Sequence, residues 1–166
     1  MTTRADYTDE EWEALARSPL VAGFAVSLAD PGGPIELTKE TMAAVRALAT
    51  PPSDEELLVA VSQYAQAHAK EHANLRKELG LKAATARRQL TGELTSVNAV
   101  LEAKATPQEA AAFRRWLVEA AQKAADAAKE GGFLGIGATR VSEGELTELA
   151  ELRSILGLDP GAERDP

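Results

Sequence analysis

The residues best suited to chemistry in this 166-residue chain are its two histidines, His68 and His72. They stand in the segment His68-Ala-Lys-Glu71-His72, and on a helix their imidazoles project from one face about 40° apart. Such a pair can share a divalent metal ion, and the His-x-x-Glu-His order is that of inverted zinc peptidases, which need a further carboxylate from a later helix. Both histidines also continue an apolar seam. We therefore favour core packing and keep metal binding by His68 and His72 as the alternative.

The rest of the composition removes most other catalytic chemistries. The chain has no cysteine, which excludes disulfides, thiolate metal sites and cysteine nucleophiles. No serine lies in the turn that nucleophilic hydrolases use, and the histidines are confined to one segment, so no Ser-His-Asp set is expected. We therefore expect a protein that is not an enzyme, with no catalytic residue and no cofactor beyond a possible divalent metal.

A glycine-rich segment, Gly131-Gly-Phe-Leu-Gly-Ile-Gly137, is the second candidate site. A phosphate-binding loop follows a strand and carries a lysine at fixed spacing, whereas this segment follows a helical pattern and has no such lysine. Its apolar residues either cover the end of a bundle or contact a partner, because large apolar side chains exposed on a loop typically mark an interaction surface. The predicted contacts for a protein partner or for self-association are Phe133, Leu134 and Ile136.

The elements that must position these residues are predicted to be helices. In a capping box a hydroxyl residue and an acid three positions later cap each other's amides, and the pattern occurs at Thr8–Glu11, Ser53–Glu56, Thr106–Glu109 and Ser142–Glu145. Ser18-Pro19 is a weaker start signal, and Gly157 is a stop signal. Together these signals predict helices over 9–17, 19–29, 38–49, 54–79, 84–104, 107–130 and 143–156.

Apolar residues recur in steps of three and four along the longer helices, which is typical of helices packed side by side. The three repeats are Leu58, Val61, Ala65, His68, His72, Leu75 and Leu79; Leu90, Leu94, Val97 and Leu101; and Phe113, Leu117, Ala120, Ala124 and Ala127. No stretch alternates as a strand would. We expect an all-α fold, an antiparallel helical bundle of about six to seven helices, two of them long. A single domain is expected over residues 1–157, with a disordered C-terminal tail over 158–166.

The acidic balance narrows the choice of partners. A net charge of −8 and a pI near 4.9 oppose binding to nucleic acid, which needs a concentrated basic surface. The basic doublets Arg87-Arg88 and Arg114-Arg115 are interpreted as solvated helix faces. The most apolar window, 20–29, is about half the length of roughly 20 residues that spans a bilayer, and residues 1–13 do not resemble a leader. These features predict a soluble, cytoplasmic protein that binds neither nucleic acid nor membrane.

Two segments resemble known families. Trp12–Glu40, with SPLVAGFAV and a Gly-Gly-Pro loop before Thr-Lys-Glu, and Phe113–Leu156, with FRRWLVEAAQKAADAAKEGGFLGIGATRVSEGE, are similar to an uncharacterised family of small all-helical bacterial proteins. The cadence of loop, hydrophobic residue, Ser or Thr, acid and helix is also similar to tellurite-resistance TerB-like helical domains. Neither resemblance carries a catalytic residue over to this chain. We expect a non-enzymatic interaction or structural module, with a metal-binding bundle using His68 and His72 as the alternative.

Overall fold

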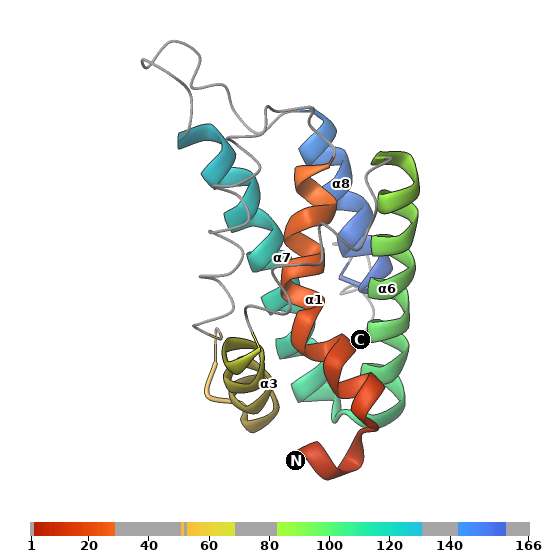
Figure 1. Cartoon of the computed structure of the whole chain (residues 1–166), viewed down its shortest axis with the longest axis vertical. Coiled ribbons are helices and arrows are strands. Elements are labelled where there is room, and N and C mark those ends of the chain that lie inside the picture. Colours follow the sequence, from red (N-terminus) through yellow and green to blue (C-terminus); the bar gives the residue numbers. More distant parts are fainter. Residues whose placement is uncertain (1, 29–50, 52, 69–82, 131–142, 159–166) are drawn as a thin grey trace, which may run out of the picture.

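The computed structural model describes residues 2–28, 51, 53–68, 83–130 and 143–158, and every regular element in these ranges is a helix (Figure 1). A 3₁₀-helix, η1, spans Arg4–Asp6, and the α-helices are α1 (Asp9–Ser27), α3 (Glu56–Ala67), α6 (Ala83–Lys104), α7 (Pro107–Glu130) and α8 (Glu143–Ile155). The all-α prediction is confirmed for this part of the chain. The predicted helix over 38–49 lies outside the described residues, and the number of six to seven helices and their antiparallel order stay predictions.

Helix α1 is the element around which the described helices are arranged. It contacts α3, α6, α7 and α8, and Figure 1 shows it running between α3 on one side and α6 on the other. Every residue from Ser18 to Ser27 is buried. A helical segment without a polar face must be covered by other elements on every side. The apolar composition of this segment therefore requires neighbouring helices around it. Among the described helices, none is long and apolar enough to cross a membrane.

The predicted break at Ser18-Pro19 is wrong, because α1 continues through Pro19 as one helix from Asp9 to Ser27. Proline has no backbone N–H, so the carbonyl of Leu15, four residues earlier, loses its usual donor. The hydroxyl of Ser18 donates a hydrogen bond to this same carbonyl at 2.8 Å. The side chain next to the proline thus satisfies the acceptor that the proline leaves open, inside the core, where an unpaired carbonyl is costly.

The predicted apolar seams are confirmed at most described positions, but His68 and Ala127 are only half-buried. Their buried members are Leu58, Val61 and Ala65 on α3; Leu90, Leu94, Val97 and Leu101 on α6; and Phe113, Trp116, Leu117, Ala120, Ala121 and Ala124 on α7. Leu149 and Leu152 of α8 complete this cluster. His72, Leu75 and Leu79 of the first seam lie outside the described residues. Helices α6 and α7 are joined by Ala105 and Thr106 alone, meet close to this connection and separate beyond it (Figure 1).

Most predicted helix ends that fall in the described residues are confirmed. The prediction of one helix over 54–79 is wrong, because α3 ends at Ala67 with His68 as its C-cap. Glu11 N–H donates to Thr8 Oγ1 at 3.2 Å and Thr8 N–H donates to Glu11 Oε2 at 2.7 Å, which is a complete capping box. At the other end of the chain Gly157, with a φ of 65°, closes α8, because Leu158 N–H reaches back to the Arg153 carbonyl at 2.8 Å. The cap predicted at Ser142 lies outside the described residues.

The capping box predicted at Ser53–Glu56 is wrong. Helix α3 begins at Glu56, and its N-cap, Glu55, makes no side-chain capping bond. The Glu55 carboxylate instead accepts a hydrogen bond from Gln108 Nε2 of α7 at 2.5 Å. A contact between two helices therefore holds the start of α3, and local sequence does not reveal such a contact.

Glu109 fastens the N-terminal segment to the start of α7. It is only 1% exposed, and its carboxylate accepts hydrogen bonds from Thr2 N–H at 2.8 Å, Thr2 Oγ1 at 3.1 Å and Thr106 N–H at 2.9 Å. Burial raises the pKa of Glu109, but the hydrogen bonds from Thr2 and Thr106 outweigh burial and leave the pKa below its ordinary value. The capping box predicted at Thr106–Glu109 is thus confirmed, and its acid also holds a residue 107 positions away.

Replacing Ser18 by alanine tests whether the Ser18 hydroxyl stabilises helix α1 where it continues through Pro19. The Leu15 carbonyl loses its donor, so we expect the free energy of unfolding in urea to fall by about 1–3 kcal/mol. In a Pro19→Ala background the backbone N–H returns, and the same Ser18→Ala change should cost less than about half as much. Ser27→Ala is the matched control, because the carbonyl that Ser27 contacts, that of Gly23, keeps its backbone donor. Equal losses in both backgrounds would contradict this account.

The low pKa of Glu109 predicts an acid sensitivity. A group with a lowered folded pKa contributes stability that is present above its unfolded pKa, near 4.5, and is lost as the pH falls through the folded value. Glu109→Gln should therefore reduce the free energy of unfolding at pH 7 by about 1–3 kcal/mol. The difference between variant and wild type should shrink as unfolding is measured at pH values progressively below 4.5. A difference that stays constant down to pH values where the protein still folds would show that ionised Glu109 is not what holds Thr2.

Candidate functional site

The predicted histidine pair is described only in part. His68 is the residue that ends α3, and its Nδ1–H donates a hydrogen bond to the Tyr64 carbonyl at 2.9 Å. Its ring stacks on the Tyr64 ring with centroids 4.0 Å apart. Glu71 and His72 lie outside the described residues, and so does any helix that would place them on the face of His68. Within the described ranges, no group of three His, Cys, Asp or Glu side chains is arranged to hold a metal ion.

The bond made by His68 decides which of its nitrogens is suited to a metal. Because Nδ1 carries the hydrogen that the Tyr64 carbonyl accepts, the lone pair of the neutral ring is on Nε2. Histidines that bind metals commonly make such a bond through their other nitrogen, which fixes the ring orientation. The hydroxyl of Tyr64 in turn donates to Glu13 Oε2 of α1 at 3.1 Å, so the ring that stacks on His68 is anchored to the central helix.

A row of aromatic rings leads from the N-terminal segment to His68. Ring centroids are 5.7 Å apart for Tyr7 and Trp12 and 6.3 Å apart for Trp12 and Tyr64. The guanidinium of Arg4 lies over the Trp12 ring, 5.3 Å from its centroid. Edge and tilted contacts of this kind, together with the cation, stabilise packed aromatic groups. The row fastens η1, α1 and α3 to one another and fixes the position of His68.

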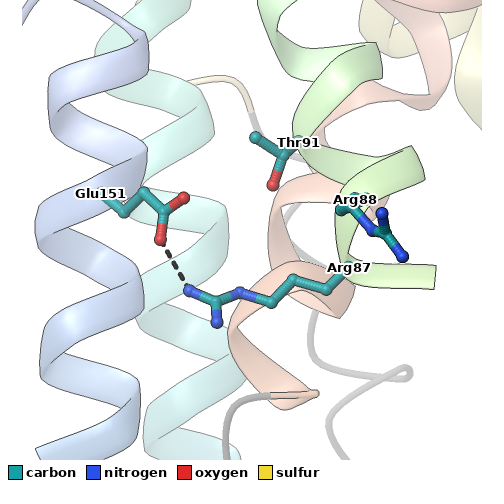
Figure 2. Close-up of a pocket in the computed structure, with 4 residues that line it drawn as sticks. All are labelled: Arg87, Arg88, Thr91 and Glu151. Atoms are coloured by element: carbon teal, nitrogen blue, oxygen red, sulfur yellow. Dashed lines mark hydrogen bonds and ion pairs between the residues drawn. The ribbon is translucent and has the colours of Figure 1, made fainter. Parts of the chain in front are cut away.

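The predicted contact loop lies outside the described residues. Phe133, Leu134 and Ile136 all fall in the range 131–142, so their part in binding stays a prediction. The described residue ranges instead contain a surface pocket at α6 and α8, with a volume of about 520 Å³. Its lining residues are Arg87, Arg88 and Thr91 of α6 and Glu151 of α8 (Figure 2).

Arg87 joins the two walls of this pocket. Its Nη2 lies 2.6 Å from Glu148 Oε2 and 2.6 Å from Glu151 Oε2. The two acids stand three residues apart on α8, which places both on the side facing α6. The Glu148 side chain is 5% exposed, whereas that of Glu151 is 44% exposed. One arginine thus holds a buried and a half-exposed carboxylate with the same nitrogen.

Electrostatic attraction stabilises the group formed by Arg87, Glu148 and Glu151. Burial raises the pKa of Glu148, and the positive charge of Arg87 opposes that rise. The Glu148 carboxylate in turn raises the pKa of Arg87, with a further contribution from Glu151. Arg87 therefore stays positively charged, and the buried acid gives its guanidinium a fixed place at the pocket.

Arg88, the neighbour of Arg87, is the exposed cation of the pocket. Figure 2 shows the Arg87 side chain reaching across to Glu151, whereas the guanidinium of Arg88 points away from that acid. Arg88 makes no hydrogen bond or ion pair with the described part of the chain. It therefore presents a positive charge to solvent beside a guanidinium whose position is fixed.

The interpretation of both arginine doublets as solvated faces is half wrong. Arg88 and Arg115 are exposed, as expected, but Arg87 pairs with α8 and Arg114 donates to Asn98 Oδ1 of α6 at 2.8 Å. One signal was present in the sequence, namely the two acids three residues apart at Glu148 and Glu151. Identifying their partner required knowing that α6 lies beside α8, which periodicity does not specify.

Comparison with known proteins assigns neither a family nor an activity. No family model matches the chain, and neither a curated protein nor a solved structure is similar enough to count as a match. The resemblances drawn from Trp12–Glu40 and Phe113–Leu156 stay predictions. The function of the chain is therefore inferred from the pocket between α6 and α8 and from the charges that line it.

Proposed function

We propose that this protein is a non-enzymatic interaction module, an antiparallel helical bundle of six to seven helices that binds a protein partner at the pocket between α6 and α8. One observation supports this more than any other: two adjacent arginines line the pocket, one fixed and one exposed. A binding site needs groups held on rigid elements, and here both walls are helices of the bundle.

The charge of the chain makes this pocket distinctive. The protein carries a net charge of −8, so most of its surface repels acidic partners. At this pocket the two positive charges of Arg87 and Arg88 are balanced by Glu148 and Glu151, which both pair with Arg87. A site with one exposed cation beside a paired one favours a partner that places a small negative group at one point over a polyanion that covers a large area.

A photo-crosslinking experiment tests the proposed site. A photoreactive amino acid in place of Thr91, inside the pocket, should form an adduct of defined mass with the partner in extracts of the source cells. The matched control is the same group at Ala103, which is exposed on α6 and lies about 18 Å further along the helix. Arg88→Glu should remove the Thr91 adduct, because it reverses the exposed charge.

The same experiment distinguishes self-association from binding to another protein. Adducts that form with the purified chain alone, at twice its mass, would identify a second copy as the partner. Equal labelling at Thr91 and Ala103, or labelling that survives Arg88→Glu, would contradict the proposed site.

A metal-binding bundle is the second candidate, and the bond at His68 Nδ1 favours it. Protein purified without a histidine tag should then carry close to one divalent metal per chain, which His68→Ala removes and Gln63→Ala, an exposed neighbour on α3, leaves in place. Elemental analysis measures this directly. Metal below about 0.1 per chain that does not change in His68→Ala would rule the metal site out.

A further inference from the structure

The two carboxylates on Arg87 are not equivalent, and this inequality indicates how the pocket works. We propose that Arg87 is a carboxylate-binding site whose occupant in the free protein is Glu151, and that an aspartate or glutamate side chain of the partner protein displaces Glu151 from it. The inference rests on the proposed function, because it concerns the same pocket. It adds the chemical class of the group bound and the internal group with which that ligand competes.

Glu148 is the reason that Arg87 stays in place when Glu151 leaves. The Glu148 side chain is almost fully buried and lies 2.6 Å from Arg87 Nη2. Removing the partner of a buried charge is strongly unfavourable, so this pair persists. Both ion pairs of Arg87 within the described chain involve Nη2, so Glu148 holds in place the same nitrogen that Glu151 occupies. A carboxylate that replaces Glu151 therefore finds this donor already oriented.

Glu151 is the exchangeable partner because its side chain is 44% exposed. Ion pairs that are open to water contribute little stability, since solvent replaces each partner well. Displacing Glu151 from Arg87 therefore costs little free energy of folding, whereas displacing Glu148 would cost much more.

Glu151 itself shows that a carboxylate suits this position. Its Oε2 lies 2.6 Å from Arg87 Nη2, the distance of a strong charge-assisted hydrogen bond. The hydroxyl of Thr91 and the exposed Arg88 line the same pocket and supply further donors. A phosphate carries more negative charge and would lie beside Glu148, which repels it more than it repels a carboxylate.

Titration with a defined peptide tests this exchange. The probe is an acetylated and amidated hexapeptide of alternating Glu and Ser, and the reference peptide has Gln in place of each Glu. We expect the Nε–Hε signal of Arg87, followed by NMR, to shift saturably with the Glu peptide alone. Glu151→Gln removes the internal competitor, so it should bind the peptide about two- to fivefold more tightly, the factor that one exposed ion pair supplies.

Two further variants make the test specific. Arg88→Gln should weaken binding, whereas Arg115→Gln, which removes an exposed arginine from α7, should leave it unchanged. Arg87→Gln leaves Glu148 buried without its cation and is expected to destabilise the fold, so the decisive variants are Glu151→Gln and Arg88→Gln. Circular dichroism is the measurement that checks whether these two variants remain folded.

The inference is overturned if Glu151→Gln binds the Glu peptide no more tightly than wild type, or if neither binds it saturably. It is also overturned if inorganic phosphate binds more tightly than the peptide, because the site then selects a different anion. These outcomes are independent of the adduct at Thr91. An adduct that persists without carboxylate binding sustains the proposed function and rejects the exchange, whereas loss of the adduct rejects the function itself.

Discussion

The burial of α1 is the constraint on which the rest of this structure depends. Between Ser18 and Ser27 the helix has no exposed face, and four other helices, α3, α6, α7 and α8, pack around α1. The amphipathic stripes of α3, α6, α7 and α8 are what this arrangement requires, because each must offer one apolar side to a common centre. The outer sides of these helices are thereby left to carry charge, and the pocket formed by α6 and α8 lies there.

Three polar side chains in the core, Ser18, Glu109 and Glu148, have partners that satisfy a backbone irregularity or join distant parts of the chain. Ser18 satisfies the carbonyl that Pro19 leaves open, Glu109 holds Thr2, and Glu148 holds Arg87. The last two join segments far apart in sequence, so they select one arrangement of the helices among those that apolar contacts alone would allow. In this bundle the apolar residues specify which faces are buried, and the buried acids specify which elements lie next to each other.

The features that could be predicted from the sequence are local ones. The seams of α6 and α7 and the boxes at Thr8 and Thr106 depend on residues within one or two turns, and all are confirmed except at the half-buried Ala127. The break at Pro19 and the cap at Ser53 were wrong because a neighbouring hydroxyl and a contact with α7 outweighed the local signal. The pocket was missed for the same reason, since the partner of Arg87 is on another helix.

The buried position of α1 also limits which substitutions the sequence can accept during evolution. A surface helix can accommodate a larger or smaller side chain by shifting outward, whereas the segment Ser18–Ser27 of α1 is buried on every side and cannot shift in this way. A change of even one methylene there is transmitted to several helices at once. Substitutions in this segment should accordingly be accepted only with compensating changes in α6 or α7, so that these three helices vary together.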